Sequence, residues 1–335
     1  MSDLISLAHG SGGEASKRLV AEIVEKYFRN DVISQLDDSA VLKIGGGRIA
    51  LTTDSYVVDP IFFPGGDIGS LAVNGTVNDL SMVGARPVGL TFGLIIEEGF
   101  ALDDLKRVLA SAAAAAREAG VEIVGGDTKV VERGAADGLF VNTSGVGVVP
   151  DGVNVSSANA RPGDAVILSG TIGDHGVAIL SKREGIAFET EVVSDSAPLN
   201  RLVAVMLEAS ASIHAMRDPT RGGLATTLNE IAQKSSVGIV LDEASVPVRP
   251  DVCEACDLLG LDVYYVANEG KLVAFVPERD AGSVLAAMRA SRYGEASAVV
   301  GRVVAENPGM VTLDTAVGGH RVLTPLWGEL LPRIC

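Results

Sequence analysis

Hydrophobic and polar residues follow two periods along this chain, one typical of helices and one typical of strands. Between residues 14 and 29, apolar residues recur every three or four positions, which predicts an amphipathic helix. Strands predicted at 40–44 and 48–58 flank a glycine-rich hairpin turn at 45–47. The other elements predicted up to residue 150 are helices at 68–84 and 102–120 and strands at 88–96, 121–124 and 139–149.

Turn-forming residues interrupt this pattern after residue 150. Pro150-Asp151-Gly152 and the run at 160–164 favour turns, which predicts a domain boundary here. A second mixed unit follows, with helices predicted at 175–183, 198–211, 222–234 and 279–290 and strands at 166–168, 237–241, 271–276, 298–304, 310–313 and 319–323. We therefore expect an α/β (α+β) protein with two domains, residues 1–150 and 151–325, and a tail at 326–335.

The composition restricts the kinds of protein that the chain can be. With 335 residues, of which 47% are apolar, it is long enough to bury the cores of two domains. Its net charge of -16 offers no basic surface for nucleic acid and disfavours binding to an anionic membrane. The longest stretch without charge, 138–150, is shorter than the roughly 20 residues that span a bilayer, and the N-terminus lacks a signal pattern. We expect a cytoplasmic protein with neither a nucleic-acid nor a membrane partner.

Three cysteines are too few for a disulfide framework in a chain of this length. Cys253 and Cys256 have the spacing of a redox pair, but the second pair that a four-cysteine zinc site needs is absent. For these two, buried or half-buried helix cysteines are the favoured interpretation. Cys335 is the last residue, and composition alone favours a frayed end with an incidental thiol. However, Pro332 favours an extended end, and six extended residues reach roughly 20 Å, far enough to carry a thiol into a cleft.

Several common catalytic motifs are missing. There is no P-loop, because the single Gly-Lys pair, Gly270-Lys271, is followed by leucine. The glycine run at 45–50 lies between two predicted strands and is interpreted as a hairpin rather than a dinucleotide site. The four histidines lack metal-ligand spacing, and no Gly-x-Ser-x-Gly motif supports a serine hydrolase.

Aspartates at strand ends or beside glycines are the most informative polar residues. They are Asp37-Asp38, Asp54, Asp79 and Asp127. A triphosphate is too negative to lie beside carboxylates unless Mg²⁺ bridges them, and Mg²⁺ prefers a few carboxylate oxygens together with phosphate and water. For any one of these residues a solvated turn is an equally good interpretation, but four together favour a site for a polyphosphate.

Two glycine-rich turns and one glutamate complete the candidate chemistry. The turns at 9–13 and 218–223 each precede a predicted helix, where backbone amides bind anions, and Arg221 could hold phosphate in a planar fork. Taken alone, each is more often an ordinary turn. Glu269 lies between apolar segments, so it is either a desolvated proton acceptor with a raised pKa or part of a surface turn with Lys271, and the residues leave both open.

These residues together resemble the HypE family of hydrogenase maturation factors, within the aminoimidazole-ribonucleotide-synthetase-like (PurM-like) superfamily of ATP-using enzymes. The resemblance runs from end to end. The segments that carry it are His9-Gly10-Ser11-Gly12-Gly13, Thr53-Asp54-Ser55-Tyr56-Val57, Asp59-Pro60, Phe62-Phe63-Pro64-Gly65-Gly66, Gly126-Asp127-Thr128-Lys129-Val130-Val131, Gly173-Asp174-His175-Gly176, Thr220-Arg221-Gly222-Gly223, Ala267-Asn268-Glu269-Gly270-Lys271 and Pro332-Arg333-Ile334-Cys335. The last segment is the most specific.

The resemblance implies a reaction at the terminal thiol. The carbamoyltransferase HypF would place a carboxamide on Cys335, and this chain would dehydrate it to a thiocyanate with ATP. The cyano group would then pass to iron held by the HypC–HypD complex, as a ligand of the [NiFe]-hydrogenase active site. By family match Glu269 is the base for the amide nitrogen, and Lys129 is the cation that orients this nitrogen or neutralises charge.

The resemblance also implies a nucleotide site and a dimer. The ATP site would comprise Gly12, Gly13, Asp38, Asp54, Asp79, Asp127, Asp218, Thr220 and Arg221, and the Mg²⁺ ligands would be Asp38, Asp54, Asp79 and Asp127. The domain 1–150 would bind ATP and associate with a second copy, and the tail 326–335 would be flexible. Two alternatives to this enzyme are a kinase or synthetase for a free small molecule and a non-catalytic assembly scaffold.

Overall fold

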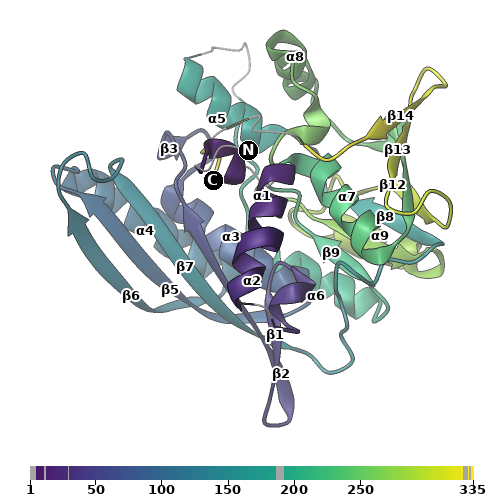
Figure 1. The fold of residues 1–335 in the computed structure, drawn as a ribbon, viewed down its shortest axis with the longest axis horizontal. Helices are drawn as coiled ribbons and strands as arrows, with labels where there is room; N and C mark the ends of the chain where they lie inside the picture. Colours follow the sequence, from purple (N-terminus) through teal and green to yellow (C-terminus); the bar gives the residue numbers. More distant parts are fainter. Residues whose placement is uncertain (1–4, 11–12, 29, 186–191, 327–330, 332) are drawn as a thin grey trace.

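Two mixed β-sheets, each with its own helices, form the body of the protein (Figure 1). The structure is a computed structural model of the 335-residue chain, and it describes residues 5–10, 13–28, 30–185, 192–326, 331 and 333–335. The α/β (α+β) class expected from the sequence is confirmed. In the described part of the chain, no helix is both long enough and apolar enough to cross a membrane.

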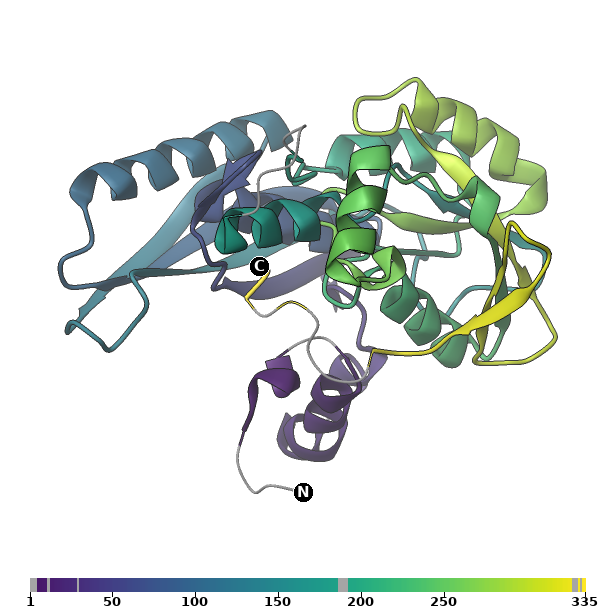
Figure 2. The same ribbon diagram turned by 90° about the horizontal axis from the view of Figure 1, so that it is seen from above.

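The first sheet is built from the first half of the chain and has its helices on one face only (Figure 2). Its strands, in spatial order, are β1 (Ala40–Ile44), β2 (Gly47–Tyr56), β7 (Leu139–Val149), β5 (Arg86–Glu97) and β6 (Glu122–Val131). Neighbours are antiparallel except β5 and β6, which are parallel. Helices α3 (Ile68–Met82) and α4 (Leu102–Ala119) cover the face on which alternate residues of β7, such as Leu139 and Val141, are buried.

Neither α3 nor α4 covers the opposite face of this first sheet, and we call it the open face. Leu51 and Ile95 point to it and are about half exposed. Their partners on β7 are Val146 and Phe140, and because alternate residues of a strand share a face, Val148 points to the open face as well.

The edge strand β6 is longer than the strand predicted at 121–124. Glycines 125 and 126 suggested the end of a strand, but β6 continues through them. Its register against β5 shifts by one residue just before them, because Val124 of β6 is left without a partner between the pairs Leu90–Ile123 and Thr91–Gly125.

The second sheet is formed by the second half of the chain and is covered by helices on both sides. Its strands, in spatial order, are β14 (His320–Leu323), β13 (Val311–Asp314), β10 (Gly238–Asp242), β12 (Ala298–Val304), β8 (Asp164–Leu168), β11 (Val273–Pro277) and β9 (Ala215–Arg217). The helices of this half are α5 (Asp174–Glu184), α6 (Asn200–Ala209), α7 (Gly223–Ser235), α8 (Pro250–Leu259) and α9 (Glu278–Arg289). The strand β9 was not predicted, since three residues carry too little pattern.

Most predicted elements agree with the structure to within a few residues. The glycine run at 45–47 forms the expected hairpin turn between β1 and β2. The helix predicted at 14–29 consists of α1 (Glu14–Leu19), a π-helical turn at Val20–Val24 and α2 (Glu25–Phe28), and residue 29 lies outside the described residues. Cys253 and Cys256 both lie on α8, but only Cys256 is buried, and Cys253 is exposed. The domain limits at 150 and 325 remain a prediction.

Candidate active site

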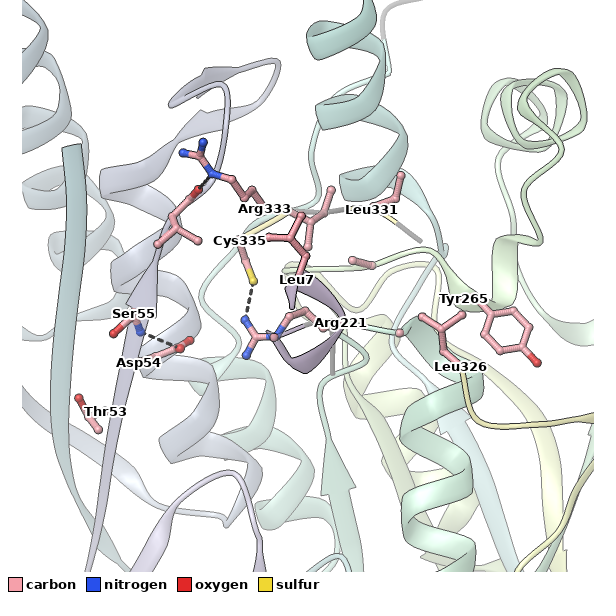
Figure 3. A pocket seen from close by; sticks show the side chains of 15 residues that line it. Leu7, Thr53, Asp54, Ser55, Arg221, Tyr265, Leu326, Leu331, Arg333 and Cys335 are labelled. Carbon is pink, nitrogen blue, oxygen red and sulfur yellow. Dashed lines mark hydrogen bonds between the residues drawn. The ribbon is translucent and has the colours of Figure 1, made fainter. Parts of the chain in front are cut away.

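The C-terminal residues of the chain lie between the two halves of the molecule, against the segment that follows β2 (Figures 2 and 3). The backbone N–H of Val57 donates to an oxygen of the terminal carboxylate of Cys335 at 3.1 Å, and that of Asp59 donates to the carbonyl of Arg333 at 3.2 Å. The tail therefore adds to this segment in antiparallel fashion, as a peptide adds to the edge of a sheet. Ile334 and Cys335 are buried, with 4% and 6% of their surface exposed.

The side chain of Arg333 strengthens this docking. Its Nε donates to the carbonyl of Val57 at 2.8 Å (Figure 3), and its guanidinium forms an ion pair with Asp137. From the other half of the molecule, Arg183 on α5 donates to the carbonyl of Arg333 at 2.9 Å. Of the tail predicted at 326–335, residues 327–330 and 332 lie outside the described residues. Residues 333–335 are thus held by backbone and side-chain contacts from both halves.

The thiol of Cys335 lies beside Arg221, in the turn that leads into α7. The Nη1 of Arg221 donates to the sulfur at 2.7 Å (Figure 3). Burial raises the pKa of the Cys335 thiol to about 12, although the charge of Arg221 acts in the opposite direction. The docked sulfur is therefore a neutral thiol at physiological pH, and it is a poor nucleophile in this position.

Two cavities meet at Arg221 and Cys335. The larger, about 480 Å³, extends towards the N-terminal segment, where Leu7 and Gly10 line it. The smaller, about 290 Å³, is lined by acidic residues and extends towards β9 and α3. The sulfur thus lies at the junction of a partly apolar cavity and a polar one.

Carboxylates from several elements surround the smaller cavity, and four aspartates among them lie on four separate elements. They are Asp38 before β1, Asp54 on β2, Asp79 on α3, and Asp218 after β9. Burial raises the pKa of Asp38 to about 6, although Arg217, 3.1 Å away, opposes this shift. Burial, and then the neighbouring charge of Asp38, raise the pKa of Asp218 to about 7.

Asp79 shows the same effect. Burial raises its pKa well above the ordinary value, and repulsion from Asp218, Asp54 and Asp38 adds to the shift. One of its oxygens accepts a hydrogen bond from the Thr52 hydroxyl at 2.8 Å. Buried carboxyl groups that repel one another in this way keep their protons to higher pH and release them more readily when a cation lies among them, so the cavity suits a bound cation.

Glu269 also lines the smaller cavity, and the structure decides between the two interpretations of its sequence. It is only 3% exposed, and its Oε1 has no hydrogen-bond partner among the described residues. Burial first, and then the charge of Asp218, raise its pKa well above the ordinary value. Its backbone N–H donates to Asp195 at 3.0 Å, which fixes the main chain at this position. Glu269 is therefore a desolvated group and not part of a surface turn.

Lys129 and Asp127 lie elsewhere. Asp54 on β2 is paired with Thr143 on β7. Thr143 is paired in turn with Phe92 on β5, and Phe92 with Gly126 on β6, so all four residues share one face of the sheet. Because neighbouring residues of a strand point to opposite faces, Asp127 points to the open face and not to the face of Asp54. Both residues are exposed, and Lys129 forms an ion pair with Asp127 at 2.7 Å that lowers the pKa of this aspartate. The structure thus does not bring them to the two cavities within one chain.

The remaining residues predicted to bind ATP also fall into two groups, those on the smaller cavity and those away from it. Thr220 lines the smaller cavity together with Asp218 and Arg221. Gly13 caps α1 on the N-terminal segment and lines neither cavity, and Gly12 lies outside the described residues.

The donor set of the smaller cavity fits a Mg²⁺–ATP ligand but not a metal ion alone. Among the described residues, no three His, Cys, Asp or Glu side chains form a group that could hold a metal ion. Mg²⁺ usually takes one or two carboxylates and completes its shell with phosphate and water. The hydroxyl of Thr226 is buried on this cavity and has no partner in the part of the chain that the structure describes, so it is a further donor for a phosphate. Asp54, Asp79 and Asp218 are the carboxylates from which one or two could bind such an ion, because Asp38 is already paired with Arg217.

Sequence reasoning missed His175, at the start of α5. Its Nε2 lies 2.8 Å from the carbonyl oxygen of Ile334, and its Nδ1 lies 2.8 Å from the hydroxyl of Ser194. The four histidines lack metal-ligand spacing, so the sequence assigned no role of its own to His175. The segment 173–176 is nevertheless one of those that carry the family resemblance, and this could have pointed to it.

Comparison with known proteins agrees with this arrangement. Two family models match the chain, "AIR synthase related protein, N-terminal domain" at residues 36–149 and "AIR synthase related protein, C-terminal domain" at residues 161–314. The protein is therefore a member of the AIR synthase related (PurM-like) class. Carbamoyl dehydratase HypE of Bradyrhizobium diazoefficiens is 56% identical to it over 99% of this chain and 96% of the relative. Within that class, the chain belongs to the HypE family of hydrogenase maturation proteins.

Solved structures support the same family. A HypE–HypF complex contains a chain that matches with a TM-score of 0.88 and 48% identity, over 92% of this chain and 99% of that one. A HypE structure in complex with ATP matches with a TM-score of 0.83 and 52% identity, over 99% of this chain and 100% of that one. This chain therefore shares the fold of these structures over nearly all of their length.

Proposed function

We propose that this protein uses ATP to dehydrate an S-carbamoyl group on its own Cys335 to a thiocyanate. The observation that carries the proposal is the position of the terminal sulfur, buried beside Arg221 at the mouth of the acidic cavity that contains Glu269. A relative named carbamoyl dehydratase and a related structure that holds ATP support it. A kinase for a free small molecule would have no need of a terminal thiol in this position.

The chemistry requires an activated oxygen and a proton acceptor. The amide oxygen of Cys335–S–C(=O)NH₂ attacks the γ-phosphorus of ATP, which gives ADP and a phosphorylated imidate, S–C(=NH)–OPO₃, after loss of one N–H proton. Loss of phosphate and of the second N–H proton then leaves S–C≡N. Phosphate is a far better leaving group than the amide oxygen itself, and Mg²⁺ neutralises charge on the phosphates when it is bound.

Two side chains near the sulfur suit these steps. Arg221, 2.7 Å from the sulfur, is within reach of an oxygen on the attached carbon and can stabilise negative charge that develops there. Glu269 is desolvated and has a raised pKa, so once ionised it is a stronger base than an exposed carboxylate and can accept the nitrogen protons. Asp38, Asp54, Asp79 and Asp218 would hold the nucleotide and its cation in the smaller cavity, next to the carbamoyl group on Cys335.

The docked thiol cannot be the form that receives the carbamoyl group. Cys335 is 6% exposed and its thiol is neutral, so another protein can reach and activate it only after the tail has left the cleft. We propose HypF as the carbamoylating partner, on the basis of the related HypE–HypF complex, and the HypC–HypD complex as the acceptor of the cyano group. The tail would thus alternate between docked and free states, which is the flexibility predicted for residues 326–335.

Lys129 and Asp127 can take part only if a second chain supplies them. They lie on the open face, where the apolar side chains of Leu51, Ile95 and Val124 are exposed. We propose that the open faces of two copies pack together, with residues 1–150 as the dimerising and ATP-binding domain, in the cytoplasm. Each copy would then present its Lys129 to the site of the other.

A complementation experiment tests this arrangement. Neither Cys335→Ser nor Lys129→Ala protein should dehydrate alone, whereas a mixture allowed to exchange subunits should regain activity, because a Lys129→Ala chain keeps its thiol and borrows the lysine. Sedimentation of each variant checks that it is still a dimer. An inactive mixture of proven heterodimers would show that Lys129 does not act across the interface.

The proposed reaction is tested by intact mass spectrometry. Protein incubated with HypF, carbamoyl phosphate and ATP should first gain one carbamoyl group on the C-terminal peptide and then lose one water. The Glu269→Gln variant should accumulate the carbamoylated form, and a chain without residues 334–335 should gain nothing. Full turnover by that truncated chain on a free small molecule would refute the proposal, and partner binding without loss of water in the wild type would favour an assembly scaffold.

A further inference from the structure

We infer that His175 is a positioning residue for the reaction at Cys335, because its Nε2–H holds the carbonyl group of Ile334 and thereby fixes the sulfur against Arg221. This inference rests on the proposed function and adds to it a residue outside the set predicted from the sequence. His175 does not touch the sulfur itself, so its action is through the peptide unit that immediately precedes Cys335.

The ring of His175 is completely buried between the tail and the loop at 192–196. It has 0% exposure, and its Nε2 lies 2.8 Å from the oxygen of Ile334. The edge of the Phe63 ring packs against it, with centroids 5.6 Å apart and planes at 87°. Burial lowers the pKa of His175, so the ring is neutral at physiological pH. A neutral imidazole has one donor and one acceptor nitrogen, and which is which decides whether it can hold the tail.

Ser194 settles the tautomer. A carbonyl oxygen can only accept, so a bond from Ile334 to His175 requires the proton on Nε2. The other nitrogen, Nδ1, must then accept, and the Ser194 hydroxyl, 2.8 Å away, is the donor. That hydroxyl already accepts a hydrogen bond from the backbone N–H of Ser196 at 3.1 Å, which leaves its single proton free for the ring. Ser194 thus stabilises the tautomer that binds the tail.

The same short loop also holds Glu269. Asp195, next to Ser194, accepts from the backbone N–H of Glu269 at 3.0 Å and forms an ion pair with Lys271 at 3.0 Å. One end of the loop therefore sets the position of the sulfur through His175, and the adjacent residue sets the backbone of the proposed base. The distance between the reacting carbon and Glu269 depends on this one segment, and positioning within a fraction of an ångström strongly affects rates.

The inference is tested with two substitutions at position 175. His175→Gln keeps a donor near the place of Nε2, whereas His175→Phe keeps the ring shape and removes the donor. The rate at which iodoacetamide alkylates Cys335, followed by mass spectrometry with exposed Cys253 as the internal reference, reports how often the tail leaves the cleft. We expect His175→Phe to raise the rate for Cys335 about five- to thirtyfold, the effect of leaving one buried carbonyl unsatisfied, and His175→Gln to stay near the wild type.

Catalysis gives a second readout that simple loss of stability would not reproduce. In single-turnover dehydration of pre-carbamoylated protein, His175→Phe should be slow and His175→Gln largely rescued, with the KM for ATP unchanged in both. Ser194→Ala, which leaves the ring in place but frees its tautomer, should show an intermediate effect. Phe63→Leu, which alters packing on the same ring without touching the tail hydrogen bond, is the matched control and should leave the alkylation rate of Cys335 close to that of the wild type.

Two outcomes would overturn the inference. One is equal alkylation rates for His175→Phe and the wild type, and the other is equal effects of the Phe and Gln variants, which would indicate that volume and not the donor matters. If His175→Phe does not fold, the alkylation rates of Ser194→Ala and Phe63→Leu are compared instead. Equal rates for these two variants would then overturn the inference. Failure of the proposed function is distinguishable, since wild-type protein would then lose no water while the alkylation rates still reported on the docking of the tail.

Discussion

Replacing Ile334 by alanine should alter the two halves of the proposed cycle in opposite directions. Ile334 is 4% exposed, and its side chain belongs to the same buried cluster as Ala267 and Ile179. The substitution removes three carbon atoms, each worth about 0.8 kcal/mol when buried, so docking should weaken by about 2 kcal/mol. The backbone hydrogen bonds to Val57 and Asp59 do not depend on this side chain and should remain.

A loss of about 2 kcal/mol raises the ratio of free to docked tail about thirtyfold. Carbamoylation needs the free tail and should become faster, whereas dehydration needs the docked tail and should become slower, by no more than the same factor. Time courses of carbamoylation by HypF and of single-turnover dehydration measure both rates on the same protein. Ile334→Val, which removes one carbon, is the graded control. If both rates fell together, or if carbamoylation were unchanged, the docked tail would not be the state that limits access to the thiol.

Three further predictions concern the cavity and its support. The folded state keeps a proton on Asp218 up to about pH 7, which the unfolded chain releases near pH 4, so this stabilisation is lost as the pH rises. Between pH 6 and 8 this one group should cost the ATP-free protein about 1.4 kcal/mol of stability by chemical denaturation. Asp218→Asn should therefore reduce the slope of stability against pH, and the other carboxyls of the cavity with raised pKa values account for the slope that remains. Arg221→Met should slow dehydration at Cys335 at least a hundredfold, with carbamoylation by HypF nearly unchanged, as mass spectrometry of each step would show. Gly270→Ala would place a Cβ 1.7 Å from the carbonyl of Asp195 and should destabilise the fold by roughly 1–3 kcal/mol, whereas Gly282→Ala, on a helix with open space around it, should be neutral or stabilising in thermal unfolding.

The sequence predicted the elements of the fold because most of them bury one face and so carry a clear period. The helix at 68–84 and the hairpin around 45–47 are examples, and both agree with the structure to within two residues. The strand β6 was predicted to end seven residues too early, at 124 instead of 131. Glycines 125 and 126 look like a strand end in sequence, and an exposed edge strand has no buried face to give it a period.

The sequence predicted which kinds of residue form the candidate site, but not which of them lie together. Asp38, Asp54 and Asp79 do surround one cavity, as a set of aspartates near glycines suggested. Asp127 has the same local sequence character, yet it points to the open face, because the orientation of a strand residue depends on the register of the sheet. His175 was missed because its partner, Ile334, is 159 residues away, and local sequence carries no information on such a contact.

The contacts that dock the tail explain how one cleft could serve successive forms of the same sulfur. Val57, Asp59 and His175 all bind backbone groups of residues 333–335, and none of these bonds involves the sulfur. A carbamoyl or cyano group on the sulfur therefore leaves this part of the docking energy unchanged, and the tail can return to the cleft in each state. Discrimination between the states must then come from groups next to the sulfur. Arg221 is in contact with it, and an oxygen on the attached carbon would give this guanidinium a stronger acceptor than a neutral thiol, so we expect the carbamoylated tail to dock more tightly than the free thiol.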